Sequence, residues 1–161
     1  MNMSYSRGDK TDNVNENYRR IAGILQQKAE DFVFSDQTHT TNIRVVTEPD
    51  KGKGIIKPRD YTDVDALITD KSGIVLSTFY ADCVPILIID PVHRAIGLAH
   101  SGWKGTAGKI GQRTIEKMNI MYGTRAEDVL AAIGPSICQE CYEVSEDVAE
   151  IFLELLAELS I

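Results

Sequence analysis

Cys83 and His100 are the residues whose types and positions most clearly permit chemistry, because each stands at the edge of an apolar run near the middle of the sequence. Thiolate sulfur and imidazole nitrogen both ligate zinc, and two histidines with one cysteine would leave zinc an open position for water. The same two residues could instead work without a metal, with Cys83 as the nucleophile and His100 as its base. Both alternatives require two strand ends to lie side by side.

The chain contains three histidines, and their neighbours distinguish them. His39 lies beside Gln and Thr residues and His100 beside Ser and Gly residues, all of which suit the wall of a pocket. His93 lies in a predicted turn and is left out of the site. The candidate metal ligands are therefore His39, Cys83 and His100, and Asp82 is a candidate for proton transfer or for orienting a ligand.

The other two cysteines, Cys138 and Cys141, have the spacing C-x-x-C. A structural zinc would need a second ligand pair, and a redox pair normally opens a helix in a thioredoxin-like unit. Neither context is present in the sequence, so this pair is left out of the predicted site.

Two apolar runs must position the candidate ligands. The run from Ile86 to Ile89 is rich in β-branched residues and bounded by prolines, which predicts a strand covered on both faces. The run from Ala95 to Ala99 predicts a second strand, joined to the first as a hairpin or as a neighbour in the sheet. Either arrangement would bring Cys83 close to His100.

A glycine-containing loop follows the second strand. Ser101-Gly-Trp-Lys-Gly105 precedes a predicted amphipathic helix over residues 106–121. A strand, a glycine loop and a helix start can turn backbone N–H groups toward an anion, and Lys104 adds a positive charge. The pattern predicts a phosphate or carboxylate site at Gly102, Lys104 and Gly105, although a tight turn with a packed indole would have the same sequence.

The remaining pattern predicts an α/β or α+β sandwich with a mixed sheet, in which short strands outnumber scattered helices. Asn13 is predicted to cap a helix over residues 14–29, and Ser145 a helix over residues 145–159. The second of these helices carries an apolar stripe of Val148, Ile151, Phe152, Leu155 and Leu159. Residues 48–61 are predicted to form a long exposed loop.

Composition narrows the classes of function. At 161 residues, with 43% hydrophobic and 25% charged side chains, the chain is expected to form one globular domain spanning residues 1–161. The net charge of −7 disfavours a nucleic-acid partner. The polar N-terminus and the lack of an 18-residue apolar run lead us to expect a cytoplasmic protein without a membrane partner.

Six segments occur in order along nearly the whole chain: Gln37-x-His39, Asp65-Ala-Leu, Ala81-Asp-Cys83-Val-Pro, His100-Ser-Gly-Trp-Lys-Gly105, Ile133-Gly-Pro-Ser136 and Cys141-Tyr-Glu-Val144. With them the sequence resembles the laccase-domain family, whose members are labelled multicopper polyphenol oxidases or purine nucleoside phosphorylases. The Ala-Asp-Cys and His-Ser-Gly-Trp segments are the specific part of this resemblance.

The resemblance implies that His39, Cys83 and His100 bind a zinc ion, in an α-β-β-α fold related to the cytotoxic necrotizing factor deamidases. It also implies phosphorolysis of adenosine, inosine, guanosine and methylthioadenosine, together with adenosine deamination. The substrates would be purine nucleosides and phosphate. Alternatives are a copper oxidase acting on polyphenols, a metal-free cysteine hydrolase or deamidase using Cys83 and His100, and a non-catalytic binding module; the oligomeric state stays open.

The sequence departs from the family pattern at three positions. Thr40 stands where Gly is usual, Tyr80 where Thr is usual, and Lys104 where Arg is usual. The last change replaces a bidentate anion fork by a point charge. Family members also continue beyond the Tyr-Glu-Val segment, so we expect a chain truncated at its C-terminus.

Overall fold

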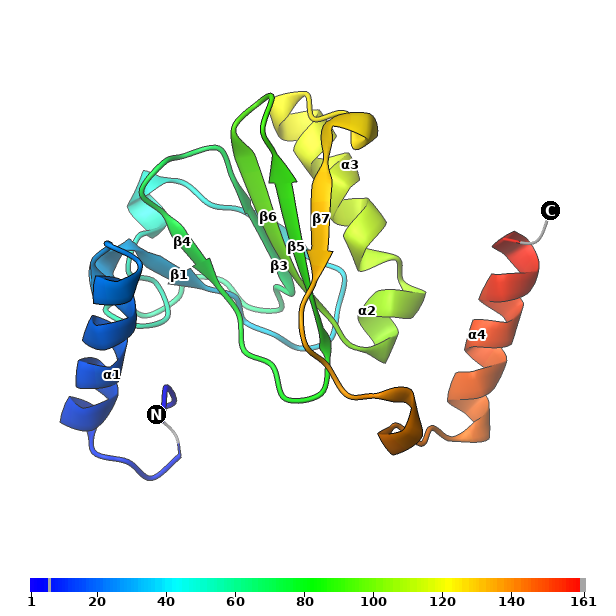
Figure 1. The fold of residues 1–161 in the computed structure, drawn as a ribbon, viewed down its shortest axis with the longest axis horizontal. Helices are drawn as coiled ribbons and strands as arrows, with labels where there is room; N and C mark the ends of the chain where they lie inside the picture. The colour runs from blue at the N-terminus through cyan, green and yellow to red at the C-terminus, as the bar shows by residue number, and fades with distance from the viewer. Residues whose placement is uncertain (6, 160–161) are drawn as a thin grey trace.

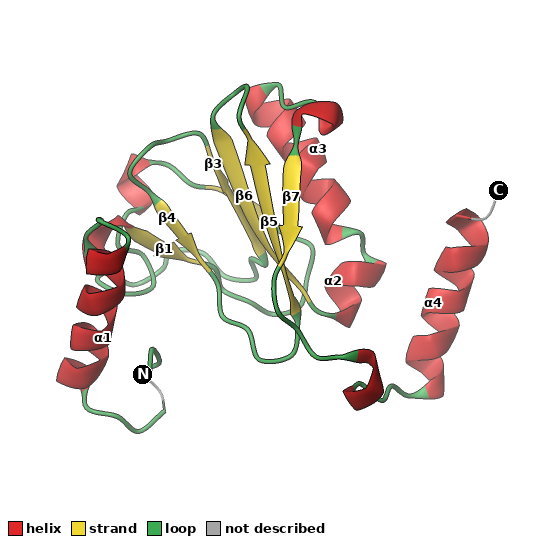
Figure 2. Ribbon diagram, in the orientation of Figure 1, coloured by secondary structure: helices red, strands yellow, loops and turns green. Residues whose placement is uncertain are grey.

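The computed structural model describes residues 1–5 and 7–159, which form two β-sheets between helices (Figures 1 and 2). The α helices and strands are α1 (Thr11–Ile24), β1 (Phe32–Phe34), β2 (Ile43–Val45), β3 (Ala66–Thr69), β4 (Val75–Ser77), β5 (Val84–Asp90), β6 (Ala95–Ser101), α2 (Trp103–Ala107), α3 (Ile110–Tyr122), β7 (Leu130–Ile133) and α4 (Glu146–Leu159). Single 3₁₀ turns occur at Ala29–Asp31, Glu48–Asp50, Ala126–Asp128 and Gln139–Cys141.

The layers run in the order α-β-β-α, as predicted (Figure 1). Helix α1 packs Tyr18 against Phe34 of the two-stranded parallel sheet β1-β4. The other face of that sheet packs Val33 against Leu67 of the five-stranded mixed sheet, whose order is β2-β3-β6-β5-β7. Helix α3 covers the far face of the larger sheet. The apolar side chains thus form stacked cores between successive layers.

Strands β5 and β6 form an antiparallel hairpin, so the two predicted strands are sequence neighbours joined by a turn. In this register Pro85 pairs with His100, while β6 also pairs with β3, where Ala99 faces Ala66. Residue 83, residue 100 and residue 65 therefore lie at one end of three adjacent strands. This register places the candidate site at that end of the sheet.

The prediction that the first of these strands is covered on both faces is wrong. Ile88 is buried with Met118 of α3, but Leu87 and Ile89 on the opposite face are 43% and 47% exposed. The smaller sheet packs on β3 through Leu67, and it leaves β5 open. An apolar run between prolines did not distinguish a half-covered strand from a fully buried one.

Both predicted helix boundaries in the first two-thirds of the chain need correction. The helix predicted over residues 106–121 is divided into α2 and α3, because Lys109 adopts a left-handed conformation with φ of 58°. The helix predicted over residues 14–29 is α1, which begins earlier, after Lys10, and ends at Ile24. Gln26 follows it with a positive φ of 54°, so the chain turns away before Ala29.

The segment over residues 48–61 is folded around a buried carboxylate, in contrast to the exposed loop that was predicted. Asp50 is 4% exposed and accepts hydrogen bonds from Arg44 and Lys53, both at 2.7 Å. The Arg44 guanidinium also lies 4.1 Å from the ring centroid of Tyr61. The charged hydrogen bonds from Arg44 and Lys53, six and three positions away, compensate the burial of the Asp50 charge.

Helix α4 lies beyond α2 at the edge of the molecule and begins after Ser145, near the predicted cap (Figure 2). Of its predicted apolar stripe, Val148 is buried and Ile151 is 38% exposed; the side chain of Leu159 lies outside the described residues. Across the described part of the chain, every helix is too short or too polar to cross a membrane.

Candidate metal centre

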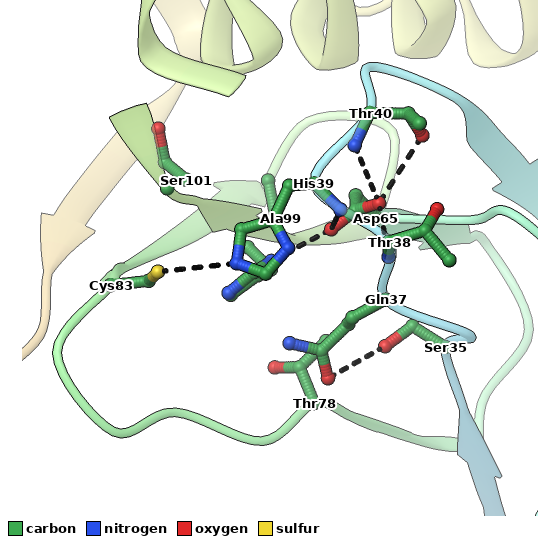
Figure 3. Close-up of polar contacts among 12 residues, drawn as sticks. Ser35, Gln37, Thr38, His39, Thr40, Asp65, Thr78, Cys83, Ala99 and Ser101 are labelled. Atoms are coloured by element: carbon green, nitrogen blue, oxygen red, sulfur yellow. Dashed lines mark hydrogen bonds and ion pairs between the residues drawn. The ribbon is translucent and has the colours of Figure 1, made fainter. Parts of the chain in front are cut away.

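Three side chains from separate parts of the chain converge at one end of the larger sheet: His39, Cys83 and His100. Their ligand atoms all lie within 4.8 Å of one another, and Cys83 Sγ is 3.8 Å from His39 Nε2 (Figure 3). His39 comes from the loop between β1 and β2, Cys83 directly precedes β5, and His100 lies on β6. The structure therefore brings together the three residues predicted as metal ligands.

Asp65 holds the imidazole of His100 and the backbone of the loop that carries His39, a function that the sequence analysis did not assign. Its carboxylate is fully buried and accepts hydrogen bonds from the backbone N–H groups of Thr38 at 3.0 Å, His39 at 3.2 Å and Thr40 at 2.9 Å. Asp65 Oδ1 also lies 2.7 Å from His100 Nδ1. Two signals were available in the sequence: a charged residue precedes the buried strand Ala-Leu-Ile-Thr, and Asp65 opens one of the segments shared with the family.

The electrostatics of Asp65 agree with this arrangement. Burial by itself raises the pKa of the Asp65 carboxyl, but the hydrogen bonds from Thr40, His100 and Thr38 outweigh it and hold the pKa below the ordinary value. The carboxylate therefore stays charged. The hydrogen bonds from Thr38, His39 and Thr40 to this carboxylate also stabilise the backbone of the loop. His39 adopts a positive φ of 65° there, which is unusual for a residue with a side chain.

The residues present fit a tetrahedral metal ion. Because His100 Nδ1 faces Asp65, its Nε2 is left for a metal, which is the usual carboxylate–histidine–metal arrangement. Zinc bond lengths at a tetrahedral angle put a sulfur and a nitrogen ligand about 3.6 Å apart, close to the 3.8 Å between Cys83 and His39. Three ligands would leave one position open.

Gly102 supplies the space that this set requires. A Cβ at position 102 would lie 2.7 Å from His39 Cδ2 and 3.1 Å from Cys83 Sγ. A larger residue would therefore require the His39 ring and the Cys83 thiol to move. The structure thus places Gly102, predicted to face an anion, where a side chain would collide with two of the candidate ligands.

The thiol of Cys83 is not activated by its surroundings. Burial raises its pKa above the ordinary value, and the negative charges of Asp82 and Asp65 raise it further. Nucleophilic cysteines have a lowered pKa, produced by a nearby positive charge or a helix N-terminus. The negative charges of Asp82 and Asp65 are therefore more consistent with a Cys83 that binds a cation than with a Cys83 that acts as a free nucleophile.

A small cavity of about 230 Å³ opens beside Cys83. Asp82 and Ser101 supply polar groups to its wall, and Trp103, Tyr142 and Phe152 supply aromatic ones. The exposed Asp82 thus lines this cavity, and its function in proton transfer or in orienting a ligand stays a prediction. A larger apolar hollow of about 370 Å³ lies over the open face of β5 and β6, away from the ligands.

The other candidate residues lie at the border of this site or outside it. Lys104 is exposed, and its Nζ is 5.5 Å from the centroid of the Trp103 indole, while Gly105 is buried against the backbone of His100. The phosphate-binding function of Lys104, Gly102 and Gly105 stays a prediction.

The residues left out of the predicted site lie elsewhere. Cys138 and Cys141 are exposed free thiols. His93 lies at the opposite end of the β5–β6 hairpin, 2.8 Å from Asp90.

Together these features define an α/β protein with a mixed sheet and a His-Cys-His group that could hold one metal ion. The chain belongs to the family described as multi-copper polyphenol oxidoreductase laccase, whose model matches residues 1–160. This agrees with the resemblance seen in the sequence.

Two named relatives and one solved structure show which proteins within this family the chain resembles. The chain is 43% identical over 146 residues to a purine nucleoside phosphorylase of Deinococcus radiodurans, covering 91% of this chain and 53% of that protein. It is 37% identical over 133 residues to adenosine deaminase RL5 of an unknown prokaryotic organism, covering 82% and 50%. The crystal structure of Bacillus licheniformis hypothetical protein YfiH matches with a TM-score of 0.87 and 35% identity, covering 96% and 58%. This chain therefore spans about half the length of the curated relatives it matches.

Proposed function

We propose that this chain carries the metal centre of a zinc-dependent purine nucleoside phosphorylase that also deaminates adenosine and cleaves methylthioadenosine. The observation that carries the proposal is the convergence of His39, Cys83 and His100 at one end of the sheet. The names of the relatives from Deinococcus radiodurans and of RL5 support the two reactions.

In this proposal the chain's own residues hold and orient the site. His39 Nε2, Cys83 Sγ and His100 Nε2 would bind zinc, and Asp65 would fix the second imidazole. The chemistry that zinc supplies when bound is Lewis-acid activation of water or substrate. Asp82, which is exposed at the cavity wall beside Cys83, would exchange a proton with solvent.

The cavity beside Cys83 would hold the nucleoside. Its aromatic side chains, Trp103, Tyr142 and Phe152, suit a flat purine ring. Phosphorolysis consumes phosphate and yields the free base and ribose 1-phosphate, whereas deamination consumes water and yields inosine and ammonia. Lys104 and the backbone amides around Gly102 and Gly105 would hold the phosphate needed only by the first reaction.

Copper oxidation and metal-free hydrolysis are less well supported. Oxidases with several coppers rely mainly on imidazole ligands, and only two of the three histidines of this chain lie at the site. A cysteine hydrolase would need an activated Cys83, but the pKa of this thiol is raised.

Metal analysis and product analysis on the same preparation test the proposal. We expect about one zinc per chain and, with adenosine and phosphate, adenine plus ribose 1-phosphate, both lost on chelation and restored by zinc. Full turnover in metal-free protein would favour the hydrolase. More than one copper per chain with oxygen uptake on a phenol would favour the oxidase.

A further inference from the structure

The side-chain amide of Gln37 bridges two loops that each carry a candidate metal ligand. Gln37 Nε2 donates to the carbonyl oxygen of Phe79 at 2.6 Å, and the Phe79 N–H donates to Gln37 Oε1 at 2.8 Å. Ser35 Oγ donates to the same Oε1 at 3.2 Å (Figure 3). One amide group is thus fixed from both sides.

This bridge continues the small parallel sheet beyond its last residues. Phe34 pairs with Ser77 at the end of β1 and β4, and the Ser35 N–H donates to the Ser77 carbonyl at 3.2 Å. The chains then separate into the two ligand loops. At that point the Gln37 amide takes the place of a strand peptide and makes both a donor and an acceptor contact with Phe79.

The positions along the chain connect this bridge to the metal centre. His39 follows Gln37 by two residues, and Cys83 follows Phe79 by four residues, so the bridge joins the start of one ligand loop to the start of the other. Other contacts tie the Cys83 loop elsewhere: the Tyr80 hydroxyl to Ala99 O at 3.2 Å, and Asp82 O to the Ile137 N–H at 3.1 Å. The first of these contacts leads to β6 beside His100 and the second to the segment after β7, and neither is made with the loop that carries His39.

We propose that Gln37 is a positioning residue that sets the separation of His39 and Cys83, and with it the affinity and geometry of the metal centre. The inference rests on the proposed metal site. Asp65 holds the backbone around His39 and the ring of His100, and Gln37 holds the His39 loop against the Cys83 loop. Removing a direct hydrogen-bond partner of a metal ligand commonly changes metal affinity by about 10–100-fold, and Gln37 acts one contact further out, through the backbone of the two ligand loops.

Two substitutions at position 37 distinguish an effect of Gln37 on the metal ligands from an effect on the stability of the fold. Gln37→Met keeps the length and apolar volume of the side chain but loses both hydrogen bonds to Phe79. Gln37→Glu keeps an acceptor for the Phe79 N–H and loses the donor to the Phe79 carbonyl. Gln112→Met is the matched control, because Gln112 is an exposed glutamine on α3 whose amide donates to Glu116 at 2.8 Å, far along the chain from the ligands.

The measurement is the zinc dissociation constant by competition with a chromophoric chelator, alongside the visible spectrum of cobalt-loaded protein and the unfolding temperature. We expect Gln37→Met to weaken zinc binding at least about tenfold and to alter the cobalt spectrum. Gln37→Glu should fall between Gln37→Met and wild type, and Gln112→Met should match wild type.

A Gln37 variant that unfolds at a lower temperature yet binds zinc as tightly as wild type overturns the inference and leaves a purely structural function. If Gln37→Met does not fold, Gln37→Glu decides by the same comparison. Wild-type protein that fails to bind zinc or cobalt instead overturns the proposed metal centre itself.

Discussion

Asp65 Oδ1 lies 2.7 Å from His100 Nδ1, and the same carboxylate accepts the backbone N–H of His39 at 3.2 Å. One fully buried acid therefore fixes the ring of one candidate ligand and the loop of another. Because the carboxylate is satisfied by several donors, its charge is compensated without a lysine or arginine. The imidazole of His100 and the backbone of His39 are held before any ion arrives, and this lowers the ordering cost of binding.

We expect Asp65→Asn to weaken zinc binding by about 10–100-fold and to lower stability. An amide can donate to His100 Nδ1, and this favours the tautomer with a proton on Nε2, the nitrogen needed by the metal. It also presents an N–H₂ group to backbone donors. Zinc competition and thermal unfolding measure the two effects, with Asp70→Asn as the control, since Asp70 is exposed and pairs with Lys71. Unchanged zinc affinity in folded Asp65→Asn protein would contradict this interpretation.

We expect His39→Ala to lose bound zinc and enzymatic activity together, because two remaining ligands bind zinc weakly and without fixed geometry. His93→Ala is the matched control, since His93 lies at the far turn against Asp90. Activity and zinc content are followed through a chelator titration, with iodoacetamide labelling of Cys83 in parallel. A His39→Ala protein that keeps its activity without zinc, or a covalent intermediate on Cys83 in chelated wild type, would support the cysteine hydrolase.

Local patterns predicted the elements that carry the site. The apolar runs on either side of the turn after Asp90 form the β5–β6 hairpin, and this places residues 83 and 100 at one sheet end. Strand runs and turn residues act over a few positions, so they can be read directly from the chain. The exposure of one face of β5 depends on which distant elements pack against it, and periodicity does not encode that. The apolar pattern also gave no sign of the left-handed conformation at Lys109 that divides the predicted helix.

The organising contacts of the site were less predictable for the same reason. Asp65 reaches Thr38 across 27 positions, and Gln37 reaches Phe79 across 42. Both residues occur in segments quoted for the family resemblance, but spacing alone did not say what their side chains contact. Asp50 was assigned to an exposed loop although it is buried, because the charge pattern did not show that Arg44 and Lys53, only six and three positions away, direct their charges onto its carboxylate.

We expect the β5–β6 turn to contribute stability that is lost in acid. Asp90 is fully buried and accepts the backbone N–H groups of Val92 at 2.9 Å and His93 at 3.0 Å. Burial raises the pKa of Asp90, but hydrogen bonds including those from His93 outweigh it and lower the pKa from 3.8 to about 2. Because the folded pKa is depressed, the contribution is complete above 3.8 and disappears as the pH falls through about 2.

Asp90→Asn tests this contribution. At neutral pH the substitution should cost about 1–3 kcal/mol of unfolding free energy, since it removes charge-assisted hydrogen bonds at a buried position. The difference from wild type should shrink as the pH is lowered, and urea unfolding between neutral pH and pH 2 measures it. A difference that stays constant with pH would mean that the Asp90 side chain matters for shape and not for charge.

Lys104 tests the phosphate half of the proposed function. Its ammonium group is exposed near the start of α2, close to Trp103 of the cavity wall. We expect Lys104→Ala to raise the KM for phosphate severalfold and to leave adenosine deamination unchanged, because deamination consumes water and has no anionic co-substrate. Lys104→Arg should retain phosphate binding, since it keeps the charge and adds a planar fork of donors.

Lys71→Ala on the β3–β4 turn is the control, and both reactions are followed by chromatography of the purine products across a phosphate titration. Equal slowing of both reactions by Lys104→Ala would assign this lysine to the purine or to the fold of α2, and would remove it from the phosphate site.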